Sequence, residues 1–281
     1  MVTITQGESA QIERANASGR PPVVFVHGLW LLPSSWQRWM DLFDGAGFAP
    51  LAPGWPDDPE TVEAARANPE QFAGKGVVQV ANHFAEAIGG LDRKPAIVGH
   101  SFGGLIAQIL AGRGLSAATV AVNPAPFKGV LPLPLAAIRT TMPVLGNPLN
   151  DRRAVTLSFD QFRYGWANAV PEDEARKLYD EFHVAAPGKP IFQAAFANLN
   201  PGAETKADTK NPDRGPLLLF TGGDDHAVPP AMSRAAFKKQ SRNPGITEHV
   251  EMPDRGHSLT IDSGWREVAE KALDFVKRFG D

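Results

Sequence analysis

One serine in this chain lies between two glycines at a spacing that could make it a nucleophile. Gly99, Ser101 and Gly103 form the pattern G-x-S-x-G, between the apolar run 95–98 and an apolar helical pattern that begins at Leu105. A serine on a sharp turn between a strand and a helix projects its Oγ into solvent. Side chains two positions to either side would collide in so tight a turn, which is why glycines stand there. The pattern therefore indicates a serine nucleophile.

A serine hydroxyl needs a base to take its proton and a third group to orient that base. Two downstream loops offer these groups. Asp225 follows the apolar run 217–221, and His257 follows the weaker run 249–252. His257 is therefore the candidate base and Asp225 the candidate acid, with its neighbour Asp224 as the alternative.

Short apolar runs predict the strands that must position these residues. They lie at 22–26, 48–52, 96–98, 119–122, 217–221 and 249–252. The strongest runs are continuously apolar, which is typical of parallel strands covered on both faces.

Helical patterns alternate with these runs. They lie at 77–88, 105–110 and 265–279, and after Ser34, which we expect to cap a helix with Gln37 at the capping-box position. The first residues suggest a hairpin of 2–5 against 11–14. The alternation predicts an α/β fold, with a mostly parallel central sheet flanked by helices.

The alternation stops between residues 126 and 215. Four helical patterns, at 133–141, 159–169, 172–184 and 190–198, fill this stretch, which is rich in large apolar residues. We therefore expect a helical cap, or lid, inserted at 126–215 into a core formed by residues 1–125 and 216–281.

Composition excludes several classes of protein. The 281 residues include no cysteine, which rules out disulfides, thiolate nucleophiles and Cys-ligated metals. The net charge is −3 with scattered Lys and Arg, so neither nucleic acid nor an anionic membrane is an expected partner. No apolar run approaches the roughly 20 residues of a membrane span. The first residues lack the pattern of a secretory signal, so we expect a cytoplasmic protein.

The same residues resemble the α/β-hydrolase superfamily over nearly the whole chain. The matching segments are 24–30 with its His27-Gly28 pair, the elbow at Ser101, Asp225 followed by Val228-Pro229, and Gly256-His257. The resemblance implies that Ser101 attacks a carbonyl carbon, His257 acts as base and then acid, and Asp225 orients His257. It also implies an oxyanion hole made by the backbone N–H groups of Leu29 and Phe102, with Trp30 as the alternative to Leu29.

These residues predict a serine hydrolase that needs no cofactor or metal. We expect a carboxylesterase that cleaves small to medium hydrophobic esters through an acyl-enzyme, as a monomer or a homodimer. Trp30, His27 and His100 are the expected pocket residues, although His27 could instead brace the oxyanion loop and His100 pack beside the elbow. Amidase, lactonase, C–C hydrolase, perhydrolase and dioxygenase chemistry remain open on this fold, as does a receptor without turnover.

Overall fold

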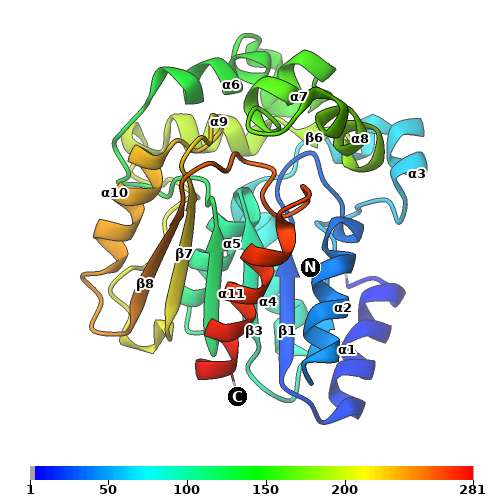
Figure 1. Cartoon of the computed structure of the whole chain (residues 1–281), viewed down its shortest axis with the longest axis vertical. Helices are drawn as coiled ribbons and strands as arrows, with labels where there is room; N and C mark the ends of the chain where they lie inside the picture. Colours follow the sequence, from blue (N-terminus) through cyan, green and yellow to red (C-terminus); the bar gives the residue numbers. More distant parts are fainter. Residues whose placement is uncertain (1–3, 281) are drawn as a thin grey trace.

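The sheet at the centre of the molecule contains six parallel strands (Figure 1). A computed structural model describes residues 4–280. The strands are β1 (Pro22–Val26), β2 (Ala49–Leu51), β3 (Ala96–His100), β4 (Ala118–Val122), β7 (Leu217–Gly222) and β8 (Thr247–Met252). Their spatial order is β2-β1-β3-β4-β7-β8, with every neighbouring pair parallel. The expected strands and the α/β class are confirmed.

Helices cover both faces of this sheet. The α-helices that precede or follow its strands are α1 (Gln6–Ser18), α2 (Gln37–Gly45), α3 (Val62–Ala67), α4 (Val77–Gly89), α5 (Phe102–Gly112), α10 (Pro230–Gln240) and α11 (Trp265–Phe279). Short 3₁₀ turns are η1 (Pro33–Trp36), η2 (Pro69–Phe72) and η5 (Pro212–Arg214). Between residues 4 and 280, no helix is long and apolar enough to cross a bilayer.

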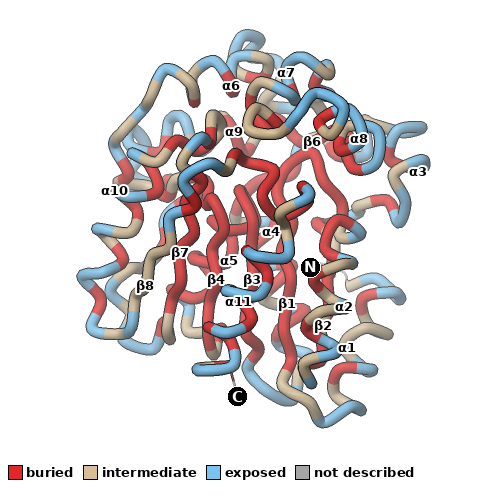
Figure 2. The backbone as a smooth tube through the Cα atoms, viewed as in Figure 1, coloured by how far each residue is buried: buried red, intermediate tan, exposed pale blue. Residues whose placement is uncertain are grey.

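Successive residues of a strand supply the two halves of the core. Val23 and Phe25 of β1 pack with the apolar faces of α2 and α11, whereas Val24 and Val26 pack with α4 and α5. Figure 2 shows β1, β3, β4 and β7 buried along their length, whereas the edge strand β8 is mostly half-buried, and exposed residues lie on the outer sides of the helices. Burial on both faces explains why the strongest strands are apolar at every position rather than at alternate ones.

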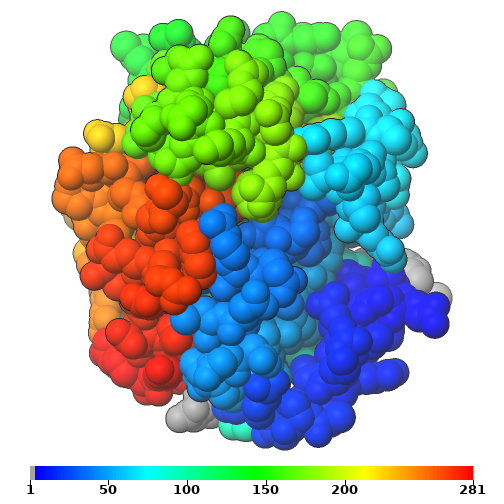
Figure 3. Space-filling model, turned by 45° about the vertical axis from the view of Figure 1, so that its right-hand side comes forward, coloured from blue at the N-terminus to red at the C-terminus, as the bar shows by residue number. Residues whose placement is uncertain are grey.

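A second group of elements lies between β4 and β7 along the chain and beyond the carboxyl ends of the strands (Figure 1). We call residues 126–215 the insertion. Its elements are α6 (Leu135–Leu145), η3 (Pro148–Arg152), β5 (Ala154–Val155), α7 (Phe159–Gly165), α8 (Glu172–Phe182), β6 (Ala186–Pro187), α9 (Lys189–Ala195) and η4 (Ala197–Leu199). In the space-filling view the insertion forms the upper part of the molecule (Figure 3). The expected helices are present, and the short antiparallel pair β5–β6 is an addition to them.

Two local expectations are wrong. Residues 11–14 belong to α1 rather than to a hairpin, and Thr5 caps that helix in a reciprocal capping box with Glu8; Val2 and Thr3 lie outside the described residues. Ser34 caps no helix, because the chain from Pro33 first makes a 3₁₀ turn, in which the N–H of Ser35 bonds to the carbonyl of Leu32, and α2 begins only at Gln37.

Candidate active site

Ser101 lies on the sharp turn between β3 and α5. Its φ of +56° is rare for a residue with a side chain, and its N–H donates to the carbonyl of Val122 at 3.0 Å. A Cβ on Gly99 would come within 2.2 Å of the Gly103 carbonyl oxygen, and one on Gly103 within 2.0 Å of the Val26 carbonyl oxygen. The crowding expected from the sequence is therefore present, and it requires glycine at both positions.

The structure brings Ser101, His257 and Asp225 into one hydrogen-bonded chain. The Oγ–H of Ser101 donates to His257 Nε2 at 2.8 Å, and His257 Nδ1–H donates to Asp225 Oδ2 at 2.7 Å. These side chains lie at the carboxyl ends of β3, β7 and β8, and all are buried. The second carboxylate oxygen of Asp225 accepts the backbone N–H groups of Ala227 and Val228 at 2.7 and 2.8 Å.

Those two N–H groups explain why Val228 follows Asp225 at this spacing: the backbone two and three residues after the aspartate folds back to hold its carboxylate. A carboxylate held through one oxygen by backbone amides can present its other oxygen to an imidazole in a fixed direction. Asp224, the alternative acid, is exposed to solvent, and no hydrogen bond joins its carboxylate to His257.

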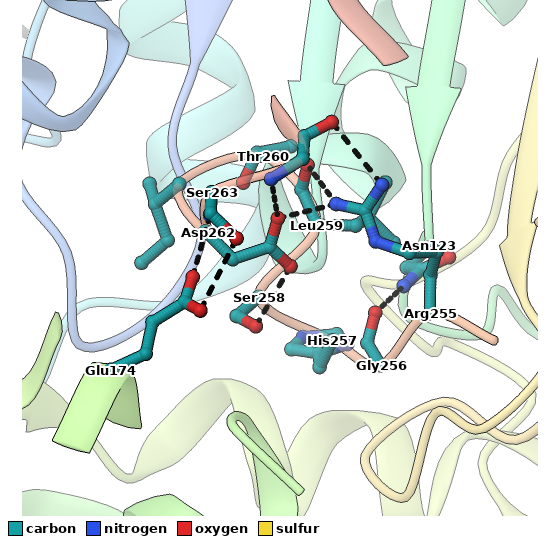
Figure 4. Close-up of polar contacts among 12 residues, drawn as sticks. Asn123, Glu174, Arg255, Gly256, His257, Ser258, Leu259, Thr260, Asp262 and Ser263 are labelled. Carbon is teal, nitrogen blue, oxygen red and sulfur yellow. Dashed lines mark hydrogen bonds and ion pairs between the residues drawn. The ribbon is translucent and has the colours of Figure 1, made fainter. Parts of the chain in front are cut away.

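A polar network fixes the loop that carries His257 (Figure 4). Asn123 Nδ2–H donates to the carbonyl of Gly256 at 3.1 Å, and the Ser258 hydroxyl donates to Asp262 at 3.2 Å. Asp262 also pairs with the guanidinium of Arg255. Burial raises the pKa of Asp262, although the charge of Arg255 opposes this rise.

Sequence reasoning missed Asn123, which connects three parts of the site. Its Oδ1 accepts the N–H of Gly222 at 2.7 Å while its Nδ2 holds Gly256, so it links the ends of β4 and β7 to the loop of His257. It has a φ of +41°. The sequence does place an asparagine directly after a buried strand, where the chain must turn, and this feature could have indicated a structural role for Asn123.

The loop after β1 runs close to the nucleophile. A Cβ on Gly28 would lie 2.8 Å from the Cβ of Ser101, so the backbone of residues 28–30 passes beside the serine. Phe102 is the first residue of α5, where helix geometry leaves N–H groups without helical partners. Among residues 4–280, the backbone N–H groups of Leu29, Trp30 and Phe102 donate no hydrogen bond. All three remain candidates for binding an oxyanion.

His27 supports this loop from behind instead of facing the pocket. Its Nε2 lies 3.0 Å from Asp58 Oδ2, and its ring stacks on Trp55. Asp58 also accepts the N–H of Trp55 and pairs with the buried ammonium of Lys75 at 3.1 Å. The structure therefore favours the bracing role for His27.

His100 is also placed away from the pocket. It is fully buried beside the elbow, and its Nε2–H donates to the carbonyl of His257 at 2.9 Å. Burial, together with the nearby His257, places the pKa of His100 well below its ordinary value, so the ring is neutral. Neither His27 nor His100 is among the described residues that line the cavity.

A cavity of about 370 Å³ opens above Ser101 and His257. Trp30, Phe102, Val228 and Met232 line it from the sheet side, and the insertion covers it. The described lining residues include no Lys, Arg, Asp or Glu. Such a cavity suits an uncharged, apolar group of the size of a small ligand.

Within residues 4–280, no group of three or more His, Asp and Glu side chains is arranged to hold a metal ion. The groups present at the site can support proton transfer by an imidazole, attack by a serine oxygen, and hydrogen bonding from backbone N–H groups.

Residues 23–271 match the family model described as the alpha/beta hydrolase family. Similar solved structures include a monoacylglycerol lipase of Paleococcus ferrophilus, with 21% identity over 91% of this chain and 93% of that chain and a TM-score of 0.62. An enol-lactonase of Burkholderia xenovorans is 18% identical over 92% of both chains, with a TM-score of 0.65. A pyrethroid hydrolase of Sphingobium faniae is 17% identical over 91% and 97%, with a TM-score of 0.61. At these identities the likeness extends to the fold, and no curated protein sequence matches the chain.

Proposed function

Because the chain belongs to the alpha/beta hydrolase family, we propose that it is a serine hydrolase that cleaves small to medium hydrophobic carboxylic esters through an acyl-enzyme. One observation carries the proposal. The hydrogen-bonded chain from Asp225 through His257 to Ser101 ends in an apolar cavity, whose described lining residues include no Lys, Arg, Asp or Glu.

The reaction proceeds in two halves. In the first, Ser101 Oγ attacks the ester carbonyl carbon while His257 Nε2 takes its proton, and Asp225 stabilises the resulting imidazolium. His257 then gives that proton to the departing alkoxide, which leaves as the alcohol. In the second half, His257 removes a proton from water, the hydroxide adds to the acyl carbon, and Ser101 leaves with the proton restored.

Backbone N–H groups stabilise the negative oxygen formed in each half. We assign this role to Phe102 and Leu29, with Trp30 as the alternative to Leu29. Removing one such donor typically costs about 3–4 kcal/mol of transition-state stabilisation. The amino end of α5 adds a favourable potential at the same point.

We assign residues 126–215 to a lid over the site. The support for this assignment is the position of the insertion beyond the carboxyl ends of the strands and its share of the cavity wall, which includes Leu131, Leu133, Trp166 and Phe196. A lid of this kind shields the acyl-enzyme from bulk water and selects the acyl group by shape.

The test is turnover of 4-nitrophenyl esters graded by acyl length. We expect a burst followed by steady turnover, with kcat/KM lowered by about 10⁴-fold or more in Ser101→Ala. The matched control is Ser233→Ala: Ser233 is buried in α10, and its hydroxyl has no partner among the described residues. Esters that bind without turnover in the wild type, or turnover that survives Ser101→Ala, would contradict the proposal.

A further inference from the structure

One short segment of the insertion, residues 164–169, contacts both loops that carry the candidate acid and base. The segment includes the last two residues of α7 and the four residues that follow this helix. Its neighbours in space are the loop after β7, with Asp224, Asp225 and His226, and the loop after β8, with Gly256, His257 and Ser258.

Two hydrogen bonds join the segment to the acid loop. Asn168 Nδ2–H donates to the carbonyl of Asp224 at 2.7 Å, and His226 Nδ1–H donates to the carbonyl of Tyr164 at 2.9 Å. These bonds hold the residues directly before and after Asp225. The orientation of the Asn168 side chain is fixed by chemistry, because only its NH₂ group can bond to a carbonyl oxygen.

The same segment holds the histidine loop. The N–H of Ser258 donates to the carbonyl of Trp166 at 2.9 Å. The indole of Trp166 meets the imidazole of His257 edge to face, with ring centres 4.5 Å apart. Gly256 faces Ala169 so closely that a Cβ on the glycine would lie 3.1 Å from the Ala169 Cβ.

The next helix of the insertion adds a further contact to this loop. Glu174 of α8 accepts the N–H and the hydroxyl of Ser263, at 2.6 and 3.2 Å (Figure 4). The insertion is thus fastened to the catalytic side of the sheet through several hydrogen bonds, over a stretch of about ten residues.

We propose that residues 164–169 set the distance between Asp225 and His257, and that Asn168 is a positioning residue for this pair. This inference rests on the proposed function, because it needs Asp225 and His257 to act on Ser101. The acid loop has two hydrogen bonds with this segment and the histidine loop has one, so loss of the Asn168 donor removes half of the hydrogen bonds that tie the acid loop to the segment that also holds the histidine loop. A misplacement of a fraction of an ångström is enough to slow proton transfer.

The experiment compares Asn168→Asp and Asn168→Ala with the wild type, using a soluble 4-nitrophenyl ester. Both variants lose the donor to Asp224, and the first keeps the shape of the side chain. Asn168 does not line the cavity, so we expect kcat to fall about 5- to 10-fold while KM stays within about twofold.

The matched control is Asn150→Asp. Asn150 also lies in the insertion, and its Nδ2 donates to the carbonyls of Pro143 and Val144, away from both catalytic loops. We expect this variant to lower the melting temperature at least as much as the Asn168 variants do while kcat stays at the wild-type value. A general loss of stability would instead lower kcat in all three.

The outcomes separate the two proposals. Folded Asn168 variants with a kcat within about twofold of wild type would overturn the positioning role and leave the proposed function intact. Activity that survives Ser101→Ala would overturn both, because the segment would then have no triad to position.

Discussion

A methyl group at position 103 would lie 2.0 Å from the carbonyl oxygen of Val26, well inside the contact distance of the two atoms. Gly99 is under the same constraint from Gly103, and Gly28 from Ser101. At the scale of single residues, therefore, the site requires glycine at positions 28, 99 and 103, because a side chain at any of them would collide with neighbouring atoms. The backbones of β1, β3 and α5 meet so closely around Ser101 that the unusual φ of the serine is held by its surroundings.

Gly103→Ala tests this constraint. Because the methyl group would meet backbone rather than a flexible side chain, we expect the free energy of unfolding to fall by about 3 kcal/mol or more, the upper end for overpacking. Urea denaturation measures the loss, or soluble yield if the variant does not fold. Gly89→Ala is the control, since a Cβ there meets nothing within 4 Å. Equal stability of the two variants would refute the crowding argument.

At the scale of elements, α1 shows how a cap and a distant partner decide a local structure. Thr5 and Glu8 form the capping box, and His83 Nε2–H of α4 donates to Glu8 Oε1 at 2.7 Å, which joins the two helices. Burial works to raise the pKa of Glu8, but the hydrogen bonds from His83 and Thr5 outweigh it and lower this pKa below its ordinary value of 4.5.

This shift predicts a pH-dependent part of the stability. The unfolded chain takes up a proton on Glu8 near pH 4.5, and the folded chain does so only at lower pH. The stabilisation is therefore complete above pH 4.5 and is lost as the pH falls through the folded pKa. We expect Glu8→Gln to cost about 1 kcal/mol at pH 7, with the difference from wild type shrinking at pH 3 in urea denaturation. Glu13→Gln, on the exposed side of α1, should change neither value.

At the scale of the whole molecule, the cavity forms where the insertion meets the carboxyl edge of the sheet. Leu131, Leu133 and Phe196 line it and are also 75%, 65% and 53% exposed, so its apolar wall continues to the molecular surface. Hydrogen bonds of Asn168 and Glu174 fasten the insertion to the loops after β7 and β8, which carry Asp225 and His257. The described lining has no charged partner for a substrate.

The lining predicts discrimination against charged acyl groups. We expect the 4-nitrophenyl ester of hexanoic acid to be cleaved with a kcat/KM about 100-fold or more above that of the monoester of adipic acid. The free carboxylate of the adipate ester would be buried without a partner, which costs several kcal/mol. Steady-state kinetics on the two esters measure the ratio. A preference for the charged ester would contradict the proposed substrate class.

The sequence by itself determined the class of fold, and it indicated the residues to which we assign the chemistry. Gly99, Ser101 and Gly103 indicate the elbow, the order of Asp225 and His257 indicates its partners, and the apolar runs predict the parallel sheet. These features are local, because each depends on residues within a few positions of one another.

Only the tertiary structure decided what lies around these residues. Asn168 and Asp224 are 56 positions apart, and Asn123 and Gly256 are 133 positions apart. The structure also placed His27 and His100 behind the site instead of in the pocket, and it formed α1 where a hairpin had been expected. The physical reason is that a hydrogen bond between distant residues depends on how whole elements pack, and no pattern along the chain records that packing.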